Sequence, residues 1–133
     1  MKISILVFSV ILLSISVTAS AQDLWGEYTL TRNCGADAVY VGPNKAEEHG
    51  GVCLHYKKGV FEMHTSYTMD KNCAPDGVYV GPNRPDLHGG YCLWLKGKKM
   101  RTSYTTNKAC GTGVYAGPNK ASEHGGYCVY IVN

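Results

Sequence analysis

Three histidines, each followed by two glycines, are the residues of this 133-residue chain whose type and spacing could do chemistry. Each histidine lies five residues after an asparagine and four after a lysine or arginine. Amide and imidazole groups both donate and accept hydrogen bonds, and paired glycines let a backbone approach a flat ligand closely. We interpret the pattern as a ligand-binding loop that occurs three times. Its members are Asn44, Lys45, His49 and Gly50, then Asn83, Arg84, His88 and Gly89, then Asn119, Lys120, His124 and Gly125.

Most positions of this loop also have a purely structural interpretation. Gly-Pro-Asn, which ends at each asparagine, is a turn signature, because proline presets φ and asparagine tolerates the left-handed region. The basic residue is either a solvated charge or a contact to a carboxylate or sulfate of a ligand. A tyrosine precedes every turn and either packs in the core or stacks on the apolar face of a sugar ring. These tyrosines are Tyr40, Tyr79 and Tyr115.

A catalytic or metal-binding role has less support. Three histidines that converge on a symmetry axis could hold one zinc ion, and this alternative stays open. Paired carboxylates do not recur in register, and the chain has no nucleophile elbow, phosphate loop or His-Glu-x-x-His motif. Catalysis usually needs a single asymmetric constellation, whereas this one is repeated. We expect no enzyme activity, no catalytic residue, no bound metal and no cofactor.

The sequence on either side of these loops is repeated as well. Segments of about 29 residues starting at Tyr28, Tyr67 and Tyr104 align with one another, and the first two match at 16 of 29 positions. The third has lost one residue after its first cysteine. We therefore expect a single domain over residues 22–133. It consists of three tandem repeats at about 28–66, 67–103 and 104–133.

Short β-strands, rather than helices, are predicted throughout. Val, Tyr and Thr are frequent, and Gly, Pro and Asn interrupt the chain about every ten residues. Each repeat is expected to have a strand at Tyr-Thr, a strand at Val-Tyr, an irregular loop and a strand through the second cysteine. The linkers should form hairpins around Gly59 and Gly97. Trp25 and Trp94 fit no repeated position and are interpreted as core or cap residues.

Three such repeats predict an all-β, closed body with threefold pseudo-symmetry. A β-trefoil is the first choice and a β-prism the second, and closure would remove exposed sheet edges. Six cysteines, two in each repeat, should be bridged alike, either within each repeat or cyclically between repeats. The within-repeat pattern is favoured, and each bridge would stabilise the fold by about 3 kcal/mol. Its pairs are Cys34 with Cys53, Cys73 with Cys92 and Cys110 with Cys128.

The N-terminus predicts export. Lys2 is followed by an apolar run of about 15 residues and by Ala19-Ser20-Ala21, the pattern of a cleaved signal peptide over residues 1–21. A membrane anchor would need about 20 apolar residues. Of the 13 Lys and Arg, 12 lie after residue 21, against 10 Asp and Glu, so the net charge there is +2. This small charge argues against a nucleic-acid partner and against membrane insertion.

Taken together, the layout resembles the small secreted threefold-repeat lectins of invertebrates, and His49-Gly50-Gly51 and its equivalents loosely resemble the His-x-Gly-Gly sites of mussel galactose-binding trefoils. The resemblance implies a multivalent sugar-binding protein, an agglutinin for galactose-type sugars. The three histidines would bond sugar hydroxyls with help from the asparagines. The basic residues would suit an acidic sugar.

Several partners and alternatives follow from these interpretations. We expect glycans on cell surfaces or glycoproteins as the partners, and an oligomer is left open. The alternative function is a secreted structural, matrix or defence protein without sugar binding. Tandem repeats and the 10 tyrosines favour the matrix interpretation, whereas the absence of low-complexity sequence argues against it.

Overall fold

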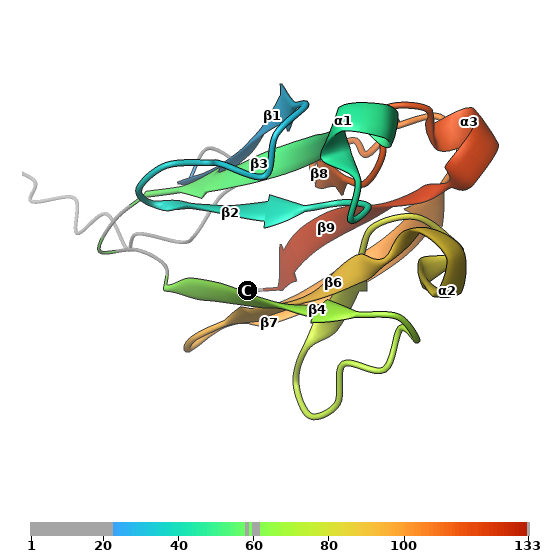
Figure 1. The fold of residues 1–133 in the computed structure, drawn as a ribbon. Helices are drawn as coiled ribbons and strands as arrows, with labels where there is room; N and C mark the ends of the chain where they lie inside the picture. Colours follow the sequence, from blue (N-terminus) through green and yellow to red (C-terminus); the bar gives the residue numbers. More distant parts are fainter. Residues whose placement is uncertain (1–22, 58, 60–61, 133) are drawn as a thin grey trace, which may run out of the picture.

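A computed structural model describes residues 23–57, 59 and 62–132. The predicted signal peptide, residues 1–21, lies outside these residues. Three units follow one another, each with two strands, a single helical turn and a third strand (Figure 1). Unit 1 has β1 (Leu24–Thr29), β2 (Ala38–Val41), α1 (Ala46–His49) and β3 (Gly51–Tyr56). Unit 2 has β4 (Met63–Thr68), β5 (Val78–Val80), α2 (Pro85–His88) and β6 (Gly90–Leu95). Unit 3 has β7 (Lys99–Thr105), β8 (Val114–Ala116), α3 (Ala121–His124) and β9 (Gly126–Val132).

Each unit forms its own antiparallel sheet of three strands. The strand orders are β1-β3-β2, β4-β6-β5 and β7-β9-β8, so the last strand of every unit is the central one. This central strand carries the second cysteine and begins at the second glycine of His-Gly-Gly, which fixes the loop to the middle of the sheet. The predicted all-β class is confirmed, and the predicted strands occur in all three repeats. No described sheet closes on itself.

Two expectations about the connections are wrong. The linkers do not form hairpins, because the strands on either side of each linker pair within different sheets. A glycine-containing turn is compatible with a hairpin, but it does not determine which strands pair. The loop between the Gly-Pro-Asn turn and His-Gly-Gly is also not irregular, since it contains one turn of α-helix in every unit. Within the described ranges, no helix has the length and apolar character needed to cross a bilayer.

One hydrophobic core joins the three sheets. The central strands contribute Leu54, Leu93 and Val129, which are 0%, 0% and 1% exposed. The neighbouring strands add Val41, Val80 and Ala116, all fully buried. These residues belong to one cluster, so no unit buries its apolar face alone. The core is small and aliphatic, which leaves a large share of the stabilisation to covalent links.

Three disulfides supply those links in the pairing favoured from the sequence. Cys34–Cys53, Cys73–Cys92 and Cys110–Cys128 join residues 19, 19 and 18 positions apart. Each bridge ties the segment before the second strand to the central strand of the same sheet. In the chain-entropy description, a loop of this length corresponds to about 3 kcal/mol per bridge. All six cysteines are accounted for in this way.

The outer ends of the sheets carry a pair of stacked side chains that differs between units. Trp25 lies opposite His55 with ring centroids 5.5 Å apart, and His64 lies opposite Trp94 at 5.1 Å. The two tryptophans therefore occupy corresponding pairs with the order exchanged. Of the two interpretations of Trp25, as a core or a cap residue, the core alternative is wrong, because this side chain is 48% exposed. In unit 3 the pair is Arg101 with Tyr130, whose guanidinium and ring are 4.2 Å apart.

Candidate functional site

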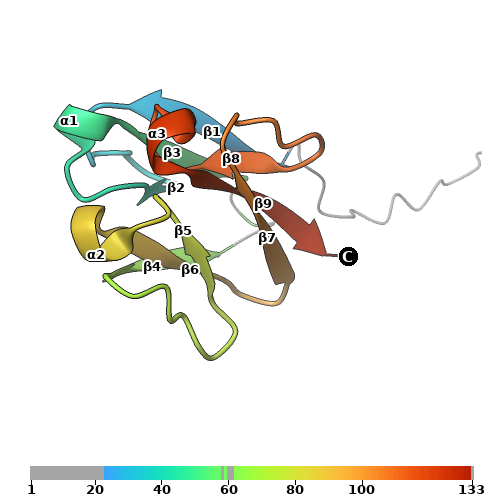
Figure 2. The ribbon, with the colours of Figure 1, turned by 90° about the vertical axis from the view of Figure 1, so that its right-hand side faces the viewer.

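The three helical turns gather at one end of the molecule (Figure 2). Each turn ends at a histidine, and the three histidine rings contact one another. Ring centroids of His49, His88 and His124 are 4.7 to 4.8 Å apart in all three pairs, and every pair is edge-to-face. We call these residues the histidine cluster. They come from segments separated by more than thirty positions in the sequence. The predicted site residues of the three repeats therefore form one continuous face.

Backbone hydrogen bonds lock the three loops to one another in a cycle. The Asn44 N–H donates to the carbonyl of His88, the Asn83 N–H to that of His124, and the Asn119 N–H to that of His49. The N···O distances are 2.7, 2.7 and 2.9 Å. Each Gly-Pro-Asn turn is thus paired with the His-Gly-Gly segment of another unit. A change in any one loop consequently affects its contact with the next unit.

The glycines after each histidine are required by packing. Gly50 has φ +70°, and a Cβ there would lie 2.5 Å from Cε2 of Tyr28 and 3.0 Å from Cβ of Asn119. The second glycine, Gly51, lies under the ring of Tyr40. The same contacts recur in units 2 and 3, with Tyr67, Tyr79, Tyr104 and Tyr115 in the tyrosine positions. Close approach of aromatic rings therefore explains the two glycines of each His-Gly-Gly segment without a ligand.

The tyrosine before each turn packs against the core and is not placed to stack on a sugar ring. These tyrosines are Tyr40, Tyr79 and Tyr115. Each hydroxyl donates a hydrogen bond to the carbonyl of the proline in its own Gly-Pro-Asn turn. Tyr40 and Tyr79 are 6% and 7% exposed. Burial raises the pKa of all three phenols. These rings hold the turn against the central strand. Tyr40 and Tyr79 are buried by this packing, whereas Tyr115 is half-buried and lines a cavity between units 1 and 3.

A second basic residue, which the sequence reasoning missed, holds each asparagine amide. Arg32 Nη1 donates to Oδ1 of Asn44, Lys71 Nζ to that of Asn83, and Lys108 Nζ to that of Asn119. The distances are 2.9, 2.9 and 2.8 Å. The available signal was a basic residue two positions before the first cysteine of every repeat. Because the amide oxygens are engaged here, a ligand would meet mainly other groups of the face.

The predicted basic residues of the loop are exposed and paired with acids of the same turn. Lys45 lies 3.7 Å from Glu48, and Lys120 lies 3.8 Å from Glu123. Arg84 instead makes a two-point contact with Asp86. These pairs give the face mixed charge rather than a positive field.

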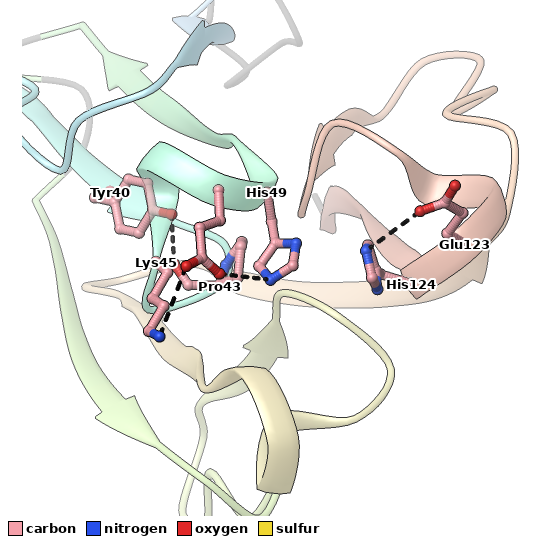
Figure 3. Close-up of polar contacts among 7 residues, drawn as sticks. Tyr40, Pro43, Lys45, His49, Glu123 and His124 are labelled. Atoms are coloured by element: carbon pink, nitrogen blue, oxygen red, sulfur yellow. Dashed lines mark hydrogen bonds and ion pairs between the residues drawn. The ribbon is translucent and has the colours of Figure 1, made fainter.

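Unit 2 differs at the position before the histidine. Glu48 Oε2 is 3.7 Å from Nε2 of His49, and Glu123 Oε2 is 3.6 Å from that of His124 (Figure 3). Unit 2 has Leu87 at this place. Desolvation, followed by the neighbouring imidazoles of His124 and His49, lowers the pKa of His88. The cluster therefore contains one histidine that is harder to protonate than an exposed imidazole.

Two polar pockets lie between units, next to the histidine cluster. The first, of about 310 Å³, is between units 1 and 3 and is lined by Tyr28, Glu48, His49, Asn119, Lys120, Glu123 and His124. The second, of about 250 Å³, is between units 1 and 2 and is lined by Asn44, Lys45, Glu48, His49, Tyr67, Met69, Leu87, His88 and Gly89. The matching positions between units 2 and 3 are Asn83, Arg84, His88, Tyr104, His124 and Gly125.

Each pocket includes a tyrosine that the sequence reasoning did not single out. Tyr28, Tyr67 and Tyr104, the first residue of each repeat, are 51%, 47% and 50% exposed. Their repetition was visible in the sequence, but their exposure was not. The tyrosine that begins each repeat thus faces solvent, whereas the tyrosine before each turn is buried or half-buried.

The convergence of three histidines does not by itself make a metal centre. Among the described residues, no group of His, Cys, Asp and Glu side chains has an arrangement that could hold a metal ion. The rings contact one another by their edges and faces. Comparison with models of protein families, with curated proteins and with solved structures found no match. The function must therefore be inferred from this face itself.

Proposed function

We propose that this chain is a secreted, multivalent carbohydrate-binding protein, and not an enzyme. The observation that carries the proposal is an exposed tyrosine beside polar side chains in pockets of 310 and 250 Å³ at two of the unit junctions. An aromatic face suits the C–H surface of a pyranose ring, and imidazole, ammonium and carboxylate groups suit its hydroxyls. The pockets are small enough for one or two sugar residues.

The charges of the pockets favour neutral, galactose-type sugars over acidic ones. Glu48 and Glu123 line the pocket between units 1 and 3, together with the ammonium group of Lys120. A carboxylate on a ligand would be the third in this pocket and would be repelled by the other two. Between units 1 and 2, Leu87 replaces one of the acids, so this pocket should tolerate an acidic sugar better.

Multivalency supports a role on glycan-covered surfaces. A single shallow sugar pocket is typically weak, around millimolar, and several pockets on one rigid body raise avidity without new contacts. The proposal includes an approximately threefold body of the prism type, with the pockets at one end, and agglutination of cells. Export by the predicted signal peptide is part of it. Three disulfides are compatible with an oxidising, extracellular location.

A glycan array tests the function, and a pair of variants tests the site. The His49→Ala/His88→Ala/His124→Ala variant should lose binding to whatever sugar the wild-type protein binds. The matched control is His55→Ala/His64→Ala, which removes two histidines that stack on tryptophans at the outer ends of the sheets. This control should bind as the wild type does.

The outcomes separate the parts of the proposal. An array without bound sugar would overturn the function. Equal binding by both variants, with circular dichroism showing that both are folded, would overturn the site while leaving the function. Loss of binding by the control alone would move the site to the outer ends of the sheets. Titration calorimetry of the best sugar gives the number of sites.

A further inference from the structure

A third cavity, larger and apolar, lies at the junction of units 1 and 3. It has a volume of about 480 Å³, within the range of small-molecule sites. Leu24 and Val52, 2% and 7% exposed, form part of its wall together with Val114. Trp25 and Tyr28 add two aromatic side chains that are about half exposed. The cavity is therefore apolar inside and open to solvent.

Two departures from the repeat occur at this junction. Gly26 pairs with Leu54 in the register where Thr65 pairs with Leu93 and Thr102 pairs with Val129. Unit 1 thus has no side chain where the other units have a threonine.

The second departure lies in the turn before the facing strand. β1 packs against β8, and the turn before β8 is the one that has lost a residue, leaving Gly111-Thr112-Gly113. All three residues line the cavity. Both departures remove atoms at the same cavity, one from β1 and one from the turn before β8.

The polar groups of the cavity indicate which charged group its ligand would carry. Lys108 and Asn119 line it and are exposed, and none of the described residues that line it is Asp or Glu. Lys108 Nζ donates one hydrogen bond to Oδ1 of Asn119 at 2.8 Å. An ammonium group has three donors, so two remain for a ligand. The cavity thus offers one positioned cation beside an apolar wall.

We propose that this cavity binds a small amphipathic molecule with a flat apolar body and one anionic group. The body packs against Leu24, Val52 and Trp25, and the anion accepts hydrogen bonds from Lys108. The site differs in chemistry from the polar pocket between the same units, which contains two carboxylates. It shares Tyr28 and Asn119 with that pocket, but the inference does not depend on sugar binding.

Titration with 8-anilinonaphthalene-1-sulfonate, an aromatic sulfonate, tests the proposal on the folded protein. Its fluorescence should rise and saturate at one molecule per chain. Gly26→Thr introduces the residue that the other units carry and should weaken binding at least tenfold. Lys108→Met should weaken it about tenfold, whereas Lys71→Met, which removes the equivalent cation in unit 2, should change it less than twofold. The uncharged N-phenyl-1-naphthylamine should respond to Gly26→Thr but not to Lys108→Met.

Each outcome decides a part of the inference. A folded Gly26→Thr protein with wild-type affinity would overturn the cavity as the site. Equal losses in Lys108→Met and Lys71→Met would overturn the anionic end of the ligand. A signal that never saturates would mean surface adsorption and would overturn the proposal altogether. If Gly26→Thr does not fold, quenching of Trp25 fluorescence by the bound probe, measured with Trp94→Phe, locates the site, and unquenched emission would overturn it.

Discussion

The loop end of the molecule and the apolar cavity between units 1 and 3 use the internal repeat in opposite ways. At the loop end, each His-Gly-Gly segment accepts a hydrogen bond from the Gly-Pro-Asn turn of another unit, so a change in one repeat disturbs its neighbour. At the cavity, β1, β3 and β8 form the wall, and Gly26 and the shortened turn have departed from the repeat. A residue that recurs in all three repeats can therefore be required for contacts between units, and not only for contacts with a ligand.

We expect the largest effect from a glycine-to-alanine substitution at the loop end, which we compare with the same substitution at the cavity. Gly90→Ala would put a Cβ 2.5 Å from Cε2 of Tyr79, a buried ring whose hydroxyl is bonded to Pro82. We expect a loss of about 2 kcal/mol in the free energy of unfolding, because the ring cannot move away without losing this bond. Urea denaturation followed by circular dichroism measures it.

Gly26→Ala is the matched partner. A Cβ at this position lies 3.0 Å from Cγ1 of Val52 and 3.2 Å from that of Val114, which can yield by a few tenths of an ångström. Alanine also costs less backbone entropy than glycine in a strand. We expect a change within about 0.5 kcal/mol. Equal losses at both glycines would mean that the cavity is packed as tightly as the loop end.

The difference between these glycines shows what the sequence can and cannot predict. The strands and the disulfide pairs follow from local patterns and from symmetry, and the structure bears them out. The contact among the three histidines does not follow from the sequence, because no local pattern indicates the distance between His49 and His88. The hairpin expectation failed for the same reason, since turn composition leaves open which strands pair. A helical turn of four residues is too short to show periodicity.

We expect an intermediate effect from lowering the pH, which should destabilise the loop end but not the cavity. The pKa of His88 is lowered in the folded protein, so below the ordinary value of about 6.5 the unfolded chain binds more protons. Stability should therefore be full above that pH and fall as the pH drops through it. Arg84 adds to the loss and Asp86 opposes it.

Denaturation at a series of pH values between 7.5 and 5 measures the effect. Leu87→Glu places beside His88 the acid that units 1 and 3 already have, and it should reduce the loss of stability between pH 7 and 5. The control is His64→Asn, away from the cluster, which should keep the wild-type pH dependence. A pH dependence that disappears in the control would move its origin to the outer end of unit 2.

We expect the smallest effects from removing a lysine, either from a polar contact that recurs in every unit or from an isolated ion pair. Lys71 Nζ lies 2.9 Å from Oδ1 of Asn83, within a turn that is already paired with unit 3. Lys71→Met should lower the free energy of unfolding by about 0.5 to 1 kcal/mol, as expected for an exposed hydrogen bond. Lys96 lies 3.4 Å from Glu62, and both side chains are more than 70% exposed. Lys96→Met should therefore change stability by less than about 0.3 kcal/mol. A larger loss at Lys96 than at Lys71 would mean that interlocking of the loops adds nothing to a hydrogen bond, and that the repeated basic residue is kept for another reason.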